Sequence, residues 1–189
     1  MHDAIAAERQ PIFVTMIDPS PEKGLMVFAR IAEEVSRRRP QAALPVIESR
    51  GSAGRLAGAA LADGFDLRRH ENILVSSAVP PPKDICAGTR VAAEALVNGI
   101  PPIVGDRGGL AEIANGGGLV APIPPEFTPK TAAPVVAEIV EPWVDPILKS
   151  TADDGFRRAA SRRALEAGRI YHRETLAPRY LEFFERAAG

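Results

Sequence analysis

The chain has 189 residues, with 23 basic against 24 acidic side chains and a net charge of −1. That length allows one large domain or two very small ones, and it is enough to bury a core. The balanced charge argues against a general nucleic-acid-binding protein, which usually has a basic excess. Aromatic residues make up only 5 % of the chain, and this aliphatic profile is common in parallel α/β sheets.

The N-terminal segment and the single cysteine bear on location. Residues 1–10 contain no apolar core of a signal peptide and are expected to be a loose lead-in. No apolar run approaches the ~20 residues of a membrane helix, so no transmembrane segment is predicted. Cys86 has no second cysteine to pair with, which favours a reducing, cytoplasmic compartment.

The first third of the chain predicts a strand, a helix and a second strand. Residues 12–17 are a continuous β-rich run, as in a central strand buried on both faces. Ser20 and Pro21 suit the N-cap and first position of a helix, and three arginines before Pro40 suit its end. The apolar face of this helix consists of Leu25, Phe28, Ala29, Ala32 and Val35. A strand is then predicted over 44–48.

The rest of the chain continues this alternation. The elements predicted are a helix at 50–62, a strand at 72–76, a stiff proline loop at 80–82, a helix at 90–98, strands at 102–105 and 118–121, a proline-rich loop at 122–134, and helices at 135–149, 153–170 and 173–187. The pattern predicts a doubly wound parallel sheet with right-handed crossovers, in one domain over residues 1–189. Ligands of such sheets bind at the carboxyl ends of the strands.

Two motifs fall at those carboxyl ends. The first is Pro21-Glu22-Lys23-Gly24, directly after the strand at 12–17. The second begins with Glu94-Ala95-Leu96, continues through Gly99 and Pro101, and ends with Gly108-Gly109-Leu110-Ala111-Glu112. A lysine in the first turn of a helix suits a diphosphate, because the helix N–H groups and dipole already attract anions. Paired glycines let the backbone approach a ligand closely.

In this order the two motifs resemble the second domain of retaining GT-B glycosyltransferases of the group 1 class, over roughly residues 12 to 185. The resemblance implies a Rossmann-like domain, the C-terminal half of a GT-B fold, that binds a UDP-, GDP- or ADP-sugar without a metal or another cofactor. The whole enzyme would transfer the sugar to an acceptor hydroxyl, with an N-terminal acceptor-binding domain that this chain does not supply. We expect the isolated chain to bind the donor at best, without turnover.

The resemblance also implies roles for six donor-binding residues, while no catalytic residue is assigned. Lys23 and Gly24 would contact the phosphates, Glu94 the ribose hydroxyls, and the donor would lie against Gly108, Gly109 and Glu112. Simpler interpretations stay open: a solvated Lys23, a Glu94 on an exposed helix side, and a plain glycine turn with Glu112 in a helix. The apolar neighbours of Glu94 favour the ribose role, because an unpaired acid among them would be costly.

The chain departs from the family pattern in three places. Ile17 and Asp18 stand where the family has an arginine that shares the diphosphate charge, and an acid is unfavourable there. Cys86 stands where the family has the first acid of a Glu-x7-Glu pair. Only residues 80–90 replace a strand and a P-S-x-x-E loop, which we expect to reflect residues left out between Lys83 and Val91 rather than a deletion.

Two other functions stay open. The missing arginine and the missing acid favour a non-catalytic, Rossmann-like remnant that serves as an interaction module. The other function is a related GT-B enzyme such as a sugar epimerase. No Cys/His cluster has metal-ligand spacing, and neither a P-loop nor a G-x-G-x-x-G fingerprint occurs.

Several further residues are expected to be structural. His70 should face solvent, His172 should lie at a helix cap or on the surface, and Trp143 should pack a helix onto the body. The terminal helix at 173–187 carries Leu176, Tyr180, Leu181, Phe183 and Phe184. By the same resemblance this helix would pack on the first domain; otherwise it would fold onto its own domain.

Overall fold

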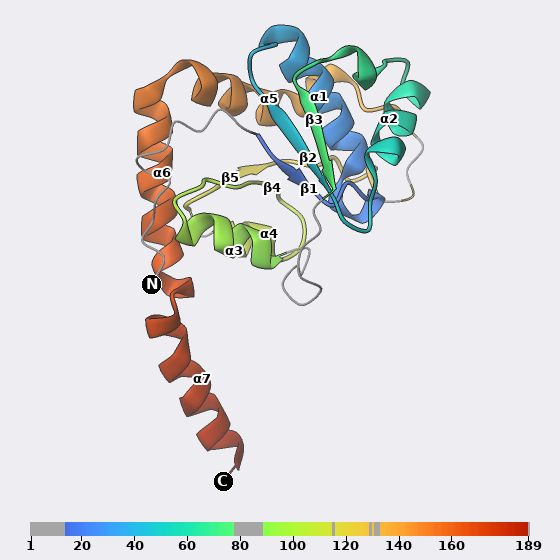
Figure 1. The fold of residues 1–189 in the computed structure, drawn as a ribbon. Helices are drawn as coiled ribbons and strands as arrows, with labels where there is room; N and C mark the ends of the chain where they lie inside the picture. The colour runs from blue at the N-terminus through green and yellow to red at the C-terminus, as the bar shows by residue number, and fades with distance from the viewer. Residues whose placement is uncertain (1–13, 78–88, 115, 129, 131–132, 189) are drawn as a thin grey trace. The chain divides into compact units, whose positions relative to one another are not determined.

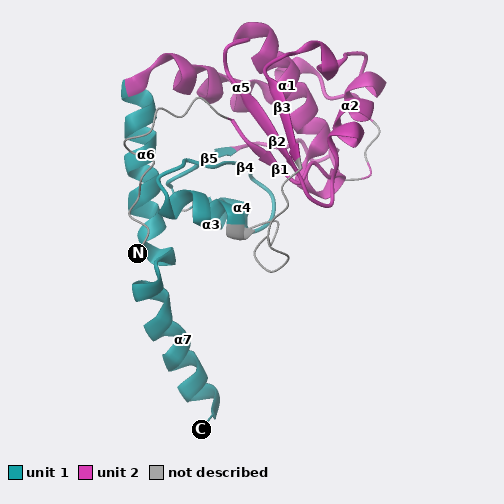
Figure 2. Cartoon of the chain, viewed as in Figure 1, with its two compact units in different colours: residues 1–10, 88–120, 155–189 teal, residues 11–87, 121–154 magenta. Residues whose placement is uncertain are grey.

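The computed structural model describes residues 14–77, 89–114, 116–128, 130 and 133–188 (Figure 1). The chain divides into two compact units (Figure 2). Unit 1 comprises residues 1–10, 88–120 and 155–189, and unit 2 comprises residues 11–87 and 121–154. The single domain over residues 1–189 stays a prediction.

Unit 2 contains a three-stranded parallel sheet in the order β1-β2-β3. Its strands are β1 (Met16–Ile17), β2 (Leu44–Glu48) and β3 (Ile73–Ser77), and its helices are α1 (Leu25–Arg38), α2 (Ala53–Ala62) and α5 (Ala137–Ala152). Short 3-10 turns, η2 (Pro21–Lys23) and η3 (Leu67–Arg69), precede α1 and β3. Strand and helix alternate as the sequence predicts, so the α/β class with parallel strands is confirmed for this unit.

The start of the unit differs from the sequence prediction. Among the described residues β1 has only two residues, both half-buried, and it lies at one end of the sheet order. The prediction of a long strand buried on both faces is therefore wrong for residues 14 and 15, while residues 12 and 13 lie outside the described residues. The helix also starts later than predicted, because Gly24 takes a left-handed φ of 76° and separates η2 from α1.

The core of unit 2 forms on α1. All five residues of the predicted apolar face are buried, together with Ile31. The helix ends with Arg37 and Arg38 in its last turn, as predicted. Trp143 of α5 is 9 % exposed, so its predicted packing role is confirmed.

Among the described residues, unit 1 contains two short strands and four α-helices. Its elements are α3 (Thr89–Val97), β4 (Ile103–Gly105), α4 (Leu110–Ala114), β5 (Leu119–Ala121), α6 (Asp154–Gly168), η4 (Arg169–Tyr171) and α7 (Arg173–Ala188), of which β5 and α6 each have one end residue in unit 2. Strands β4 and β5 form a two-stranded sheet. With three and two strands, the sheets of the described residues are smaller than the doubly wound sheet that the sequence predicts.

Small residues let α3 and α6 approach closely in unit 1. Leu96 is fully buried against Ala164 and Ala167, with Tyr171 packed on this cluster. A side chain on Gly168 would place its Cβ 2.7 Å from the Leu96 carbonyl carbon, so only glycine fits there. Ala164, Ala167 and Gly168 of α6 are therefore small because they pack closely against Leu96 of α3.

Two further predictions about the chain are wrong. His70 does not face solvent: its side chain is 21 % exposed and its Nε2 lies 2.6 Å from the Glu33 carboxylate. The numbering runs without a break from residue 1 to 189, so no residues are left out between Lys83 and Val91. The connection is short in this sequence itself, and its residues 78–88 lie outside the described residues.

The expectation for His172 holds. The carbonyl of His172 accepts hydrogen bonds from the backbone N–H groups of Thr175 and Leu176, so His172 caps α7 as predicted. Within the described residues, every helix is too short or too polar to cross a membrane.

Candidate functional site

The predicted phosphate-binding turn follows β1 at the carboxyl edge of the unit 2 sheet. Lys23 is the last residue of η2, and the carbonyl of Ser20 accepts hydrogen bonds from the backbone N–H groups of Lys23 and Leu25. The Lys23 side chain is half-buried and makes no hydrogen bond or ion pair with the residues that the structure describes. Its ammonium is thus available to a ligand at the start of α1.

Asp18 occupies the same edge of the sheet and has a structural task there. Its side chain is only 2 % exposed, and its Oδ1 accepts a 2.7 Å hydrogen bond from the backbone N–H of Gly51. This bond joins the loop after β1 to the loop after β2. A Cβ on Gly51 would lie 2.1 Å from the carbonyl oxygen of Pro19, so the two loops touch backbone to backbone.

Sequence reasoning treated Asp18 only as an acid near a phosphate and missed this link. Asp18 has a φ of 61°, and aspartate is one of the few residues besides glycine that adopts this conformation readily. The position of Asp18 between a predicted strand and Pro19 was the signal in the sequence that could have indicated this turn.

The predicted ribose contact, Glu94, lies on the exposed side of α3. Ala92 and Leu96 are buried on the same helix, but Glu94 is not. The argument that its apolar neighbours would make an unpaired acid costly is therefore wrong, since water solvates the carboxylate. The ribose role stays a prediction on the resemblance alone.

The glycine turn is also exposed. Gly108 has a φ of 65°, and no atom lies within 4 Å of the position that its Cβ would take. Gly108 and Gly109 precede α4, a five-residue helix whose first turn carries Glu112. The simpler interpretation, a tight turn followed by Glu112 in a helix, describes this geometry.

The six predicted residues are divided between the two units. Lys23 and Gly24 belong to unit 2, whereas Glu94, Gly108, Gly109 and Glu112 belong to unit 1. Within unit 1, α3 and α4 are in contact, so the two acids lie on neighbouring helices. The assembly of all six residues into one donor site stays a prediction.

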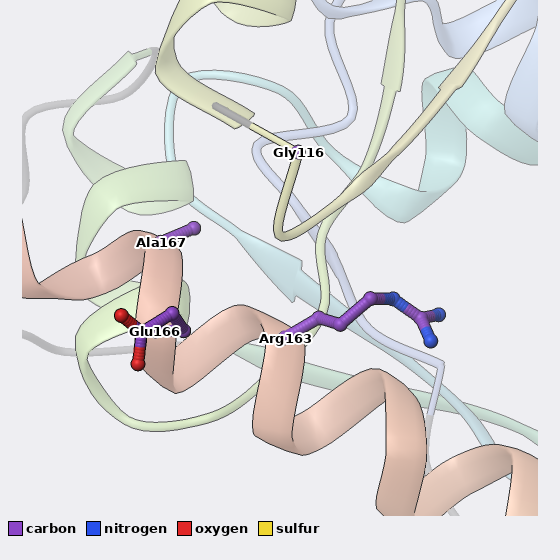
Figure 3. A pocket seen from close by; sticks show the side chains of 4 residues that line it. All are labelled: Gly116, Arg163, Glu166 and Ala167. Carbon is purple, nitrogen blue, oxygen red and sulfur yellow. The ribbon is translucent and has the colours of Figure 1, made fainter.

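Two hollows on the described residues contain no predicted site residue. One, of about 320 Å³ in unit 1, is lined by Gly116, Arg163, Glu166 and Ala167 (Figure 3). Figure 3 shows Arg163 and Glu166 extending from α6 in opposite directions, and Glu166 pairs with Arg169 at 3.1 Å. The other, of about 300 Å³ in unit 2, lies among apolar side chains of β2, β3 and α2 beside Arg68 and His70.

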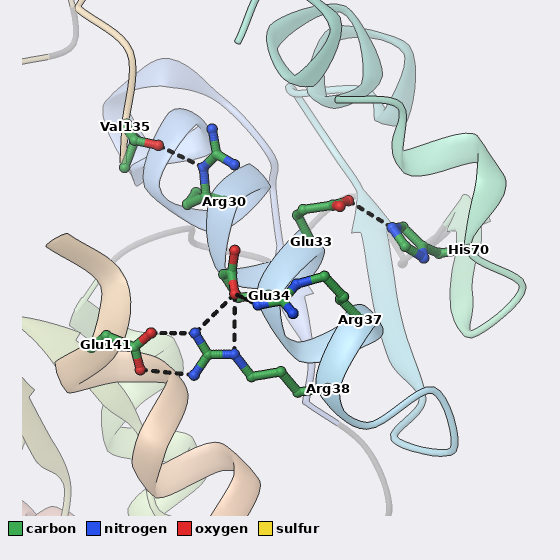
Figure 4. Close-up of polar contacts among 8 residues, drawn as sticks. All are labelled: Arg30, Glu33, Glu34, Arg37, Arg38, His70, Val135 and Glu141. Carbon is green, nitrogen blue, oxygen red and sulfur yellow. Dashed lines mark hydrogen bonds and ion pairs between the residues drawn. The ribbon is translucent and has the colours of Figure 1, made fainter. Parts of the chain in front are cut away.

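The strongest charge network of unit 2 lies on α1 and joins it to α5 (Figure 4). The Glu34 carboxylate is 5 % exposed and accepts hydrogen bonds from Arg37 at 2.7 Å and Arg38 at 3.1 Å. Arg38 also donates two hydrogen bonds to Glu141 of α5. Nearby, the Arg30 Nε donates to the carbonyl of Val135 at 2.6 Å.

This network lowers the pKa values of two carboxyl groups, those of Glu34 and Glu141. Burial raises the pKa of Glu34, but the hydrogen bonds and charges of Arg37 and Arg38 outweigh it, so the pKa is lowered from 4.5. Hydrogen bonds from Arg38 likewise lower the pKa of Glu141. Each charge of the network has an opposite partner, and the pair of Arg38 with Glu141 links α1 to α5.

The comparisons assign the chain to no group of proteins. No family model matches the sequence, and no curated protein matches it. Among the residues that the structure describes, no group of three or more His, Cys, Asp or Glu side chains could hold a metal ion.

Proposed function

We propose that this chain is the donor-binding domain of a GT-B glycosyltransferase, of the retaining group 1 class. The observation that carries the proposal is the position of Lys23 and Gly24 at the carboxyl end of β1. In the order β1-β2-β3, β1 is the end strand of the described sheet, next to which a doubly wound sheet would reverse. Nucleotide ligands of such sheets bind at this point, on helix N-termini.

Each proposed residue has a chemical task that suits its type. The Lys23 ammonium would offset the charge of the diphosphate and of the leaving nucleotide, with the N-terminus of α1 adding a positive dipole. Glu94 is a carboxylate that can accept two hydrogen bonds from the vicinal hydroxyls of ribose. Gly108 and Gly109 would leave space for the donor sugar, and Glu112 would line that space.

The parent enzyme would move the sugar from the nucleotide diphosphate to an acceptor hydroxyl. It would need an N-terminal acceptor-binding domain, so this chain by itself would bind the donor without transferring it. A cytoplasmic location belongs to the same proposal, because the single cysteine, Cys86, has no second cysteine to pair with and fits a reducing compartment.

A second candidate function is favoured by Asp18. The family arginine that shares the phosphate charge is replaced by an acid that holds the loop after β2. A chain that had lost the donor could keep such a link for stability alone. This describes a non-catalytic, Rossmann-like module that binds another macromolecule.

Calorimetric titration with UDP, GDP and ADP separates the two candidates. We expect saturable binding of one nucleotide, weakened about tenfold to a hundredfold by Lys23→Ala and by Glu94→Ala, as for the loss of a charged hydrogen bond. Lys130→Ala and Glu138→Ala remove exposed charges of the same types elsewhere and should leave the affinity unchanged. Absence of binding by all three nucleotides would favour the non-catalytic module.

A further inference from the structure

Two loops touch at the carboxyl edge of the unit 2 sheet. The first follows β1 and spans residues 18–24, and the second follows β2 and spans residues 49–52. Asp18 Oδ1 accepts a 2.7 Å hydrogen bond from the backbone N–H of Gly51, and a Cβ on Gly51 would lie 2.7 Å from the backbone nitrogen of Ser20. A ligand of the first loop therefore lies next to the second loop as well.

Each of the two loops carries one cation that has no partner. Lys23 is half-buried and Arg50 is exposed, and neither side chain makes a hydrogen bond or an ion pair with a residue that the structure describes. The acids of these loops are Asp18 and Glu22. One cation against two acids gives the loops a net charge of −1 when Arg50 is left out, and a diphosphate at Lys23 would be repelled by that charge. A second cation is needed to offset it.

The two cations are close enough to hold one ligand. The Ser20 carbonyl accepts a 2.9 Å hydrogen bond from the backbone N–H of Lys23. Together with the contact between Gly51 and Ser20, this bond limits the distance between the Cα atoms of Arg50 and Lys23 to about 16 Å. Extended lysine and arginine side chains each reach about 6 Å from their Cα atoms. Hydrogen bonds of about 2.8 Å to two phosphate oxygens span the rest.

We propose that Arg50 is a second phosphate-binding residue, which holds the diphosphate of the ligand together with Lys23. This role rests on the donor-binding function proposed above and adds to it a residue from a different loop. Arginine suits the task, because its guanidinium stays charged and offers forked N–H donors that match phosphate oxygens. Asp18 is then a positioning residue, since its bond to Gly51 holds the residue next to Arg50 against the first loop.

Calorimetric titration of the whole chain with UDP, GDP, ADP and inorganic pyrophosphate tests the role of Arg50. For pyrophosphate and for the nucleotide that binds, Arg50→Ala and Lys23→Ala should each raise the dissociation constant about tenfold, as for the loss of a charged hydrogen bond. Arg69→Ala is the matched control, because Arg69 is an exposed arginine of η3, before β3 and thus at the amino edge of the same sheet. It should leave both dissociation constants unchanged.

The same titrations separate a failure of this role from a failure of the donor site. Binding that Lys23→Ala weakens and Arg50→Ala does not would overturn the role of Arg50 and leave the donor site in place. Binding that Arg69→Ala weakens as much as Arg50→Ala would also overturn it, because the effect would then follow the overall charge of the chain. A wild type that binds neither a nucleotide nor pyrophosphate would contradict both the donor site and the role of Arg50.

A double-mutant cycle tests the positioning by Asp18. Asp18→Gly removes the bond to Gly51 but keeps the left-handed backbone accessible, so the effect of Arg50→Ala should fall from about tenfold to about threefold or less. Asp18→Asn keeps an acceptor oxygen and the same backbone preference, so there the effect should stay at about tenfold. An undiminished effect in Asp18→Gly would overturn the positioning role. Circular dichroism would establish that each variant stays folded.

Discussion

Helices α1 and α7 have similar length and pattern but opposite surroundings. The first has 14 residues and the second 16, and both gather their apolar side chains on one side. More than half of α1 is buried, whereas no residue of α7 is. The comparison teaches that periodicity defines which side of a helix is apolar, while the rest of the fold, or another chain, decides whether that side is covered.

Long-range partners account for the difference. Helix α1 contacts α2 and α5, and Arg38 ties it to Glu141 of α5 by two hydrogen bonds. The charge contacts of α7 that the structure describes are local, such as Glu182 with Arg186. Pairs of this kind stabilise a helix by only about 0.2–0.5 kcal/mol. These local ion pairs therefore do not hold α7 against a core.

Phe28→Ala in α1 should have the largest effect on stability. Phe28 is 8 % exposed, and the substitution would leave a cavity under α1. We expect the free energy of unfolding to fall by about 3–5 kcal/mol, the usual cost of removing a buried phenylalanine ring. Urea denaturation followed by circular dichroism would measure it. A loss below about 1 kcal/mol would mean that the α1 face is not a core.

The sequence predicted this part of the fold because its signals are local. The apolar face of α1, the strand at 44–48 and the terminal helix follow from periodicity, and the structure places them within a few residues of the predicted bounds. The start of α1 was missed because Pro21 looks like a first helical residue. The left-handed turn at Gly24 then ends η2 after a single turn.

The Glu34 network should have the next largest effect, and the effect should depend on pH. Glu34→Gln removes the charge that Arg37 and Arg38 share, at a cost of about 1 kcal/mol at pH 7, because both arginines are partly solvated. The pKa of Glu34 is lowered in the folded chain from 4.5. Its contribution is thus complete above the unfolded pKa and disappears as the pH falls through the folded one.

Denaturation at two pH values checks the sign of this linkage. The difference in unfolding free energy between the wild type and Glu34→Gln should shrink as the pH is lowered from 7 to below the folded pKa of Glu34, because the wild-type carboxyl then also takes up a proton. Glu138→Gln, an exposed acid in the first turn of α5, is the matched control. An unchanged difference at low pH would show that Glu34 acts by shape rather than by charge.

The position of Lys23 in the fold was predictable, but the surroundings of the candidate residues were not. Motif order alone placed Lys23 after the first strand, and the structure has it there, at the carboxyl edge of the sheet. The exposure of Glu94 and the bond from Asp18 to Gly51 could not be predicted. Both properties depend on which residues that are distant in sequence come into contact. The periodicity of a single sequence carries no signal for such contacts.

Phe184→Ala in α7 should have the smallest effect, and it is the counterpart of Phe28→Ala. The same chemical change at a ring that is 63 % exposed removes no core contact. The free energy of unfolding should therefore change by no more than about 0.5 kcal/mol, measured by the same urea denaturation as for Phe28→Ala. A loss above about 1 kcal/mol would mean that the ring packs within its own chain, and the contrast with α1 would then fail.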